Sequence, residues 1–298
     1  LVAGAAALVV LVTMASVVLA LITDTPRPTP LLTPSPSAPS VAPTEFDPAQ
    51  LRLVPGWMPD GFTDWTLEQE ARGARYTARA SSGEVAVYVA PRGVALPQPH
   101  PSGVYGVQDG GLTLNGAGST WMGQAAPLGS DSDAGMLTFN WAPDALASVS
   151  VRGLPNPKDA AVRVARELRV LVGTPTPLPF KSLEPKVPLT RLDIYFTGGK
   201  PGLRVMYLAK AGVGPGVEFQ LNLGGSAPAD RQIGPYPVAR TGSGDSEYHY
   251  YFEADADTRV MIVTRPESGR IEAGIEIAER AIGEFEMVGD IRDPSSWK

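Results

Sequence analysis

Cysteine is absent from the 298-residue chain. Its absence excludes disulfide bonds, thiol nucleophiles and cysteine metal ligands together. The folded state must therefore be stabilised by a buried core. A chain of this length, with 43% hydrophobic residues, can bury enough apolar surface to form one.

Histidine is nearly absent. The two histidines, His100 and His249, lie far apart in the sequence, so the helical histidine pair of a zinc site is missing. Alternating acidic residues at 131–133 and 253–257 resemble calcium loops, but they lack the glycine and the distant glutamate of an EF-hand. We interpret both as solvated hairpin turns and predict no metal and no cofactor.

Motifs of nucleophilic catalysis and phosphate binding are also missing. The chain has no G-x-S-x-G, and its S-x-x-K, residues 295–298, lies in a tail that we expect to fray. Glycine-rich stretches at 103–118 and 212–216 lack the Lys-Ser/Thr of a phosphate loop, and we interpret them as loops and turns. No catalytic residue is predicted, although 31 acidic residues leave open an unrecognised carboxylate pair.

Positive charge is not in excess. The formal net charge is −6, the pI is about 5.1, and the 25 basic residues are scattered. Nucleic acids and anionic lipid surfaces attract concentrated basic patches. Neither is therefore expected as a partner of the folded part.

Residues 1–23 carry no charge at all. A helix of about 20 apolar residues crosses the roughly 30 Å hydrocarbon core of a bilayer and satisfies its own backbone hydrogen bonds there. We predict a single-pass transmembrane helix at 1–23. The alternative is a signal peptide cleaved after the small residues Val18 and Ala20, although signal peptides have shorter apolar cores.

Residues 24–49 contain eight prolines together with many serines and threonines. Proline lacks a donor N–H and favours polyproline II, so this stretch is predicted to be a disordered stalk of up to about 75 Å. Tracts of this kind suit the outer face of a membrane. We therefore expect the folded part on the extracytoplasmic side.

Alternating apolar residues predict antiparallel strands beyond the stalk. Residues 136–141 place Leu137, Phe139 and Trp141 on one strand face, and residues 148–152 return beside them. Further strands are predicted at 63–68, 74–80, 85–90, 192–197, 203–209 and 217–223.

A helix is predicted after the first hairpin. Asn156 can serve as its N-cap, Pro157 suits its first turn, and apolar residues at helical spacing extend it to Val172. A second helix with the same kind of apolar stripe is predicted at 268–284. We expect each helix to pack on one face of a sheet.

The two halves share a pattern of spacing. Val149 follows Trp141 by eight residues, and a hairpin at 248–262 has the same eight-residue spacing before its helix. The predicted fold class is α+β, with two tandem modules at 50–173 and 181–290, each an antiparallel sheet with a C-terminal helix. A proline-containing linker at 174–180 joins them, a tail follows at 291–298, and a groove between the modules is the expected ligand site.

Four residues are candidates for a partner or ligand surface: Trp57, Trp121, His249 and Tyr251. Tryptophans can stack on sugars, and His249 and Tyr251 share a strand face opposite the apolar one. Trp141, in an alternating strand, is instead expected in the core.

The opening segment VPGWMPDGF, the strand MLTFNW and the helical stretches VARELRV and IAERAI resemble the exported ectodomains of bacterial membrane-anchored regulatory proteins, of the anti-sigma-factor type, and of envelope sensors. The resemblance implies an extracytoplasmic domain that senses or binds a partner and has no catalytic residues.

The sequence therefore predicts a membrane-anchored extracytoplasmic binding or sensing protein that is not an enzyme. Its expected partner is an envelope protein or a glycan. Two alternatives stay open: a structural or assembly partner in the cell envelope, and an envelope hydrolase that uses the unrecognised carboxylate pair.

Overall fold

The computed structural model describes residues 41–298 except 98–104, 125–133, 182–186, 211–212, 223–226, 243–246, 257 and 266–270. The transmembrane helix predicted at 1–23 and most of the predicted stalk lie outside the described residues. Within the described ranges, neither helix is long and apolar enough to cross a membrane. The anchor at 1–23 therefore stays a prediction.

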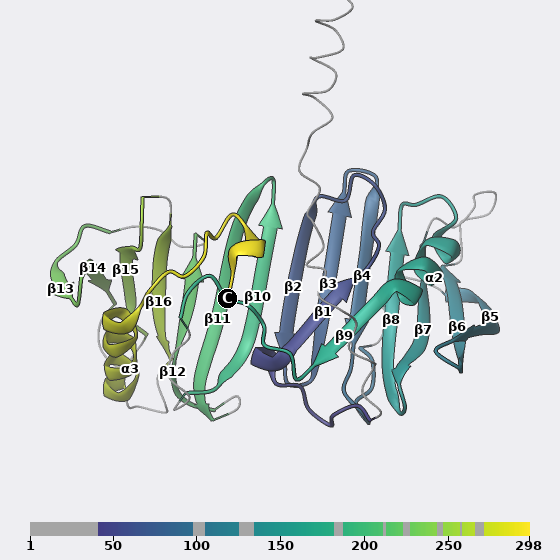
Figure 1. The fold of residues 1–298 in the computed structure, drawn as a ribbon, viewed down its shortest axis with the longest axis horizontal. Coiled ribbons are helices and arrows are strands. Elements are labelled where there is room, and N and C mark those ends of the chain that lie inside the picture. Colours follow the sequence, from purple (N-terminus) through teal and green to yellow (C-terminus); the bar gives the residue numbers. More distant parts are fainter. Residues whose placement is uncertain are drawn as a thin grey trace, which may run out of the picture. The chain divides into compact units, whose positions relative to one another are not determined.

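Most of the described chain forms antiparallel strands (Figure 1). They are β1 (Leu51–Pro55), β2 (Asp64–Glu70), β3 (Gly73–Ala80), β4 (Gly83–Val89), β5 (Tyr105–Leu114), β6 (Ala117–Gln124), β7 (Ala134–Ala142), β8 (Ala145–Arg152), β9 (Leu168–Val172), β10 (Leu189–Thr197), β11 (Lys200–Lys210), β12 (Val213–Leu221), β13 (Arg231–Ile233), β14 (Tyr236–Thr241), β15 (His249–Glu253) and β16 (Arg259–Arg265). The helices are α2 (Pro157–Glu167) and α3 (Ile271–Glu284), with short 3-10 turns η1 (Pro48–Gln50) and η2 (Pro294–Ser296).

Fourteen of the strands belong to one continuous sheet, in the order β13-β14-β15-β16-β12-β11-β10-β2-β3-β4-β8-β7-β6-β5. The order of connections is the same on both sides of the central β10–β2 pair. The remaining strands, β1 and β9, form a separate two-stranded sheet, which we call the ribbon.

The predicted α+β fold with a separate sheet in each module is wrong, because β2 and β10 join the halves into one mostly β structure. Their antiparallel register runs from Arg191 opposite Glu70 to Phe196 opposite Trp65. The Trp65 and Phe196 rings also stack, with centroids 5.9 Å apart. Without this pairing, both strands would expose a row of unpaired backbone groups.

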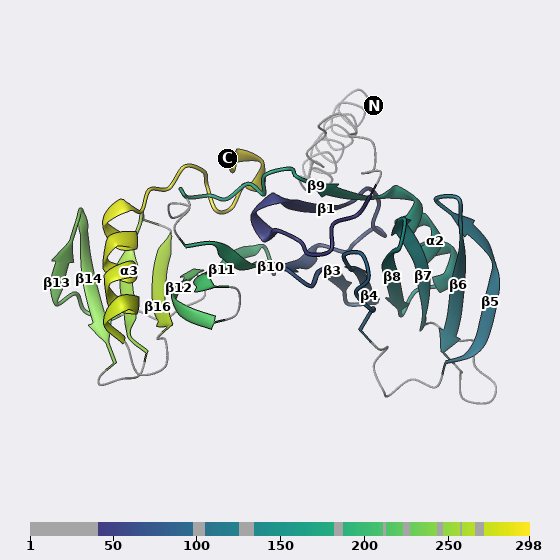
Figure 2. The same ribbon diagram turned by 90° about the horizontal axis from the view of Figure 1, so that it is seen from below.

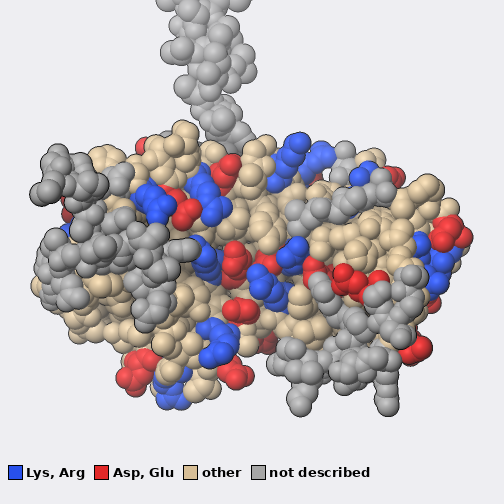
Figure 3. Space-filling view, turned by 180° about the vertical axis from the view of Figure 1, so that it is seen from behind, with Lys and Arg blue, Asp and Glu red and all other residues tan. Residues whose placement is uncertain are grey.

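The two faces of the sheet differ in the elements that lie on them. The two helices and the ribbon lie on the same side (Figures 1 and 2). Helix α2 packs on β7 and β8, and α3 packs on β12 and β16. Figure 3 shows the opposite face, where charged side chains of both signs gather across the middle.

Strand alternation follows the sequence pattern in β7. Leu137, Phe139 and Trp141 are buried, whereas Thr138 and Asn140 are partly exposed. The period of two therefore predicted the face of this strand correctly.

The first helix is shorter than predicted. It ends at Glu167, and Leu168 is already extended at φ −66° and ψ 132°. The apolar residues Leu168 and Val172 belong to β9 rather than to the helix. Asn156 does occupy the N-cap position, but it is left-handed at φ 54° and its side chain makes no capping hydrogen bond.

Several stretches interpreted as irregular are part of the fold. The glycines at 103–118 fall largely in the β5–β6 hairpin, and those at 213–216 lie in β12, so the loop interpretation was wrong there. Phe46, from the predicted stalk, is buried in the core. Ile291 and Trp297, from the tail expected to fray, are buried as well.

Candidate functional site

A cavity of about 1270 Å³ lies where the two halves of the chain meet. Its walls come from η1, the β2–β3 turn, the 175–181 segment, the first residues of β10, and part of β11. We call it the junction groove. Its volume is ample for a ligand or a partner segment, since binding sites usually measure about 300–1,000 Å³.

The floor of the junction groove is apolar and its rim carries charges of both signs. Buried side chains in the lining are Phe46, Leu178, Phe180, Val187, Leu192, Tyr207 and Leu208. Charged residues in the lining are Glu45, Asp47, Glu70, Arg72, Lys181, Arg191 and Lys298. An apolar floor with a few polar groups is the usual lining of a binding site.

The 175–181 wall is fixed from both sides. The Thr176 N–H donates to Ala49 O at 2.8 Å, and its hydroxyl contacts Pro48 O at 3.0 Å and Leu51 O at 2.5 Å. On the other side, Leu178 N donates to Lys298 O at 3.1 Å, and Lys298 N donates to Leu178 O at 3.2 Å. The wall is therefore held in place without a ligand, which lowers the entropy cost of binding.

Aromatic rings support the floor from below. Phe180 stacks on Phe219 and Phe285, with centroid distances of 5.4 and 5.3 Å. Tyr207 meets Phe219 edge to face at 5.7 Å. The 175–181 segment is thereby packed on the core, next to the residue that follows α3, rather than left as a spacer.

Two cations of the groove lining pair with acids. The Lys181 ammonium pairs with Glu286. The Arg191 guanidinium donates through Nε to both carboxylate oxygens of Asp193, at 3.0 and 2.9 Å. Tyr195 also donates to Asp193 at 3.4 Å, and burial together with the Asp193 charge raises the pKa of the Tyr195 phenol. These pairs fix the side chains near the groove.

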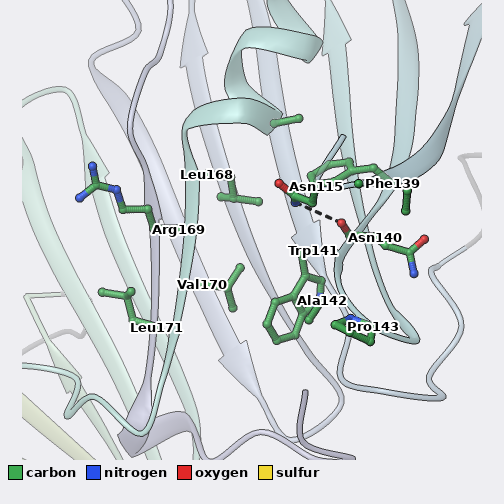
Figure 4. A pocket seen from close by; sticks show the side chains of 13 residues that line it. Asn115, Phe139, Asn140, Trp141, Ala142, Pro143, Leu168, Arg169, Val170 and Leu171 are labelled. Carbon is green, nitrogen blue, oxygen red and sulfur yellow. Dashed lines mark hydrogen bonds between the residues drawn. The ribbon is translucent and has the colours of Figure 1, made fainter. Parts of the chain in front are cut away.

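A second, smaller cavity of about 460 Å³ lies between β9, the β5–β6 turn and the end of β7 (Figure 4). We call it the edge groove. In Figure 4, Leu168 and Val170 point toward the cavity, whereas Arg169 and Leu171 point away from it. Asn115 closes one side, because its side chain donates to Asn140 O at 3.2 Å.

The four sequence-predicted surface residues do not form one site. Trp57 lies beside α2, with the Arg163 guanidinium 4.3 Å from its ring centroid. Trp121, on β6, is only 6% exposed and packs in the core. His249 and Tyr251 are neighbours on β15, where the His249 Nδ1 lies 3.3 Å from the Tyr251 hydroxyl. None of the four lines either groove.

Sequence reasoning missed the residues of the junction groove because they come from distant segments. Phe46, Leu178, Leu192 and Lys298 meet only in the folded chain. The one signal in the sequence was the proline-containing linker at 174–180, because a ligand groove was expected between the modules that it joins. Within the described part of the chain, no group of three or more His, Asp or Glu side chains could hold a metal ion.

No protein-family model matches the sequence, and no curated protein matches it. Among solved structures, the chain is weakly similar to MucB, described in "Crystal structure of MucB in complex with MucA(peri)". The sequences are 10% identical, the match covers 76% of this chain and 94% of that chain, and the TM-score is 0.24. A similarity of this size does not define a family or a function.

Proposed function

We propose that this chain is a non-catalytic binding protein of the cell envelope that holds a segment of a partner protein in the junction groove. The proposal includes the anchor at 1–23 and an extracytoplasmic folded part, both expected from the sequence. The observation that carries it is the junction groove itself, with its apolar floor, its charges of both signs and its fixed wall.

The lining favours a protein segment over a small anion or cation. Glu45 and Glu70 contribute negative charge, and Arg72 and Lys298 contribute positive charge. A ligand of a single charge would meet repulsion on part of this rim, whereas a peptide can offer both signs together with apolar side chains for the floor.

The test is site-specific photocrosslinking in cells that carry the full chain. A photoreactive amino acid replaces Leu189, a partly buried residue that lines the junction groove. The matched control replaces Ile233, a partly buried strand residue on β13 that lines neither groove. We expect one discrete crosslinked envelope protein from position 189 and none from position 233.

Affinity then separates a specific complex from proximity. The crosslinked partner is purified, and its binding to the chain is measured by calorimetry with Leu189→Asp and Ile233→Asp variants. Leu189→Asp should weaken binding at least about tenfold, because a carboxylate would be desolvated against the apolar floor. Equal affinities of the two variants, or equal crosslinking from both positions, would overturn the proposal.

A further inference from the structure

The ribbon leaves one of its strand edges unpaired. Gly56 N donates to Glu167 O at 3.0 Å, and Gly173 N donates to Gln50 O at 2.8 Å. Residues of an antiparallel strand alternate between facing the partner and facing away. Since residues 167 and 173 face β1, residues 169 and 171 between them face it as well. The backbone groups of Val170 and Val172 therefore point away from β1, and no other described strand pairs with β9.

The outer edge of β1, by contrast, is occupied. Leu51 O accepts hydrogen bonds from the Gln69 side chain at 2.8 Å and from the Thr176 hydroxyl at 2.5 Å. Pro55 on the same edge has no N–H to offer. An added strand can therefore extend the ribbon only beside β9.

The edge groove runs along this unpaired edge. Residues 168–171 form one wall, and residues 139–143 with the 115–117 turn form the other. The indole N–H of Trp141 already donates to Ala90 O at 2.8 Å, so the rest of its ring offers apolar surface. A strand laid beside β9 would place every second side chain against Phe139, Trp141 and Val170.

The positive charge of Arg169 indicates which side chains such a strand would carry on the face that points away from the groove. Arg169 is exposed, points away from the groove in Figure 4, and has no ion-pair partner among the described residues. Arg166, in the last turn of α2, is likewise exposed and has no ion-pair partner among the described residues. Opposite charges on adjacent strands attract, so acidic residues would fit next to Arg169.

We propose that the edge groove binds an extended peptide of a partner protein as a third strand of the ribbon, with apolar side chains toward Trp141 and acidic side chains beside Arg169. Backbone hydrogen bonds to Val170 and Val172 provide affinity, and the alternating side chains provide specificity. The chain's own 24–49 segment is unsuited, because its eight prolines cannot supply the donors.

This site is independent of the junction groove, because the two cavities share no lining residue. Binding at the edge groove can therefore be measured while the junction groove is empty or blocked by Leu189→Asp. Failure of one proposal does not remove the other.

The test uses a synthetic nonapeptide, EVEFEVEVE with blocked termini, and calorimetry on the purified chain. Two further peptides carry N-methyl groups at alternate positions, one at the odd residues and one at the even residues. One methylated peptide should lose at least about tenfold in affinity, because it loses two or more backbone hydrogen bonds to β9. The other should keep its affinity within about threefold. Equal effects of the two methylations, or no binding of the parent peptide, would overturn the proposal.

Charge reversal gives a second readout. Arg169→Glu should weaken binding of the acidic peptide and strengthen binding of its lysine counterpart, KVKFKVKVK. The matched control is Arg75→Glu, which changes an exposed arginine on β3 of the central sheet. If both variants change affinity equally, net charge rather than the edge groove governs binding, and the proposal is wrong.

Amide hydrogen exchange locates the added strand. The Val170 and Val172 amides should exchange quickly in the free chain and slowly in the peptide complex, whereas the Arg169 and Leu171 amides, already bonded to β1, should be protected in both. Val170 and Val172 amides that stay unprotected with bound peptide would exclude strand addition.

Discussion

At the scale of single residues, the buried carboxylate of Asp193 needs its hydrogen-bond partners for the sheet to be stable at its centre. It is 0% exposed on β10 and is satisfied by Arg191 and Tyr195. Removing a partner of a buried ion costs more than removing an exposed one, because the charge left behind loses its compensation. Arg191 is 40% exposed, so water can partly replace the lost carboxylate.

Asp193→Ala should therefore lower the free energy of unfolding by about 1–3 kcal/mol. The matched control is Glu84→Ala, which breaks a 2.8 Å ion pair with Arg79. The side chain of Arg79 is 54% exposed and that of Glu84 is 39% exposed. That change should stay within about 0.5 kcal/mol. Urea unfolding followed by circular dichroism gives both values. A loss at Asp193 no larger than the loss at Glu84 would contradict the prediction.

Tyr76 makes stability depend on alkaline pH. The ring stacks on Trp65 with centroids 5.9 Å apart, and burial raises the pKa of the Tyr76 phenol above its ordinary value near 10. Above about pH 10 the unfolded chain releases this proton while the folded chain keeps it, so the contribution is fully present below pH 10 and falls as pH rises further.

Tyr76→Phe should therefore lose less stability than the original chain between pH 8 and pH 10.5, while the two differ little at pH 8. Part of the decline should remain, because burial also raises the pKa of Tyr88, Tyr195, Tyr236 and Tyr250. Urea midpoints at both pH values measure the effect. An identical decline in the two proteins would show that Tyr76 titrates alike in the folded and unfolded chains.

At the scale of elements, a buried amide side chain of the main sheet donates a hydrogen bond to the ribbon. Gln69 on β2 donates to Leu51 O at 2.8 Å, and its side chain is fully buried. Gln69→Leu removes this donor and should lower stability by about 1 kcal/mol. Amides of β1 that bond to β9, such as Arg52, should exchange faster with solvent in this variant.

Gln232→Leu is the matched control for the ribbon. Gln232 is an exposed residue of the edge strand β13, far along the sheet order from β2, and it donates to Gly234 O at 3.0 Å. It should leave the Arg52 exchange rate unchanged. Equal acceleration in both variants would mean that the change is global rather than local to the ribbon.

Strands were more predictable than ends of elements, for a physical reason. Alternation in β7 reflects a real difference between the face on which α2 packs and the opposite face, so the pattern located Phe139 and Trp141 correctly. Leu168 and Val172 fit the helical stripe as well as they fit a strand, and only pairing with Pro55 and Leu51 decides between the two. Asn156 was correctly predicted as the N-cap residue of α2. Its side chain makes no capping hydrogen bond, and its backbone is left-handed, a conformation that asparagine tolerates better than most residues.

At the scale of the whole folded part, tertiary pairing determined what the sequence could not show. Nothing in residues 64–70 or 189–197 marks them as partners of each other rather than as edges of separate sheets. The junction groove has the same origin, because Phe46, Leu178 and Lys298 come together only after the halves join. Local patterns therefore predicted β2–β4, β7, β8, β10–β12, β15 and β16, but they missed β5 and β6, the union of the halves and the lining of the groove.

Continuity across β2 and β10 predicts that the folded part unfolds in one transition. The chain lacks cysteine, so a single fluorophore can be attached at Arg152→Cys on β8 or, in a second protein, at Glu253→Cys on β15. Both labels should report the same urea midpoint. Two independent modules would instead give two midpoints.

A substitution at the seam sharpens this test. Phe196→Ala removes the ring stacked on Trp65 and should lower stability by about 2 kcal/mol. Because the sheet is continuous, the midpoints of the β8 and β15 labels should fall by the same amount. Val41→Ala, a change at a residue that is 56% exposed, should move neither. If Phe196→Ala shifts only the β15 label, the half that contains β10 unfolds by itself and the seam does not couple the two halves.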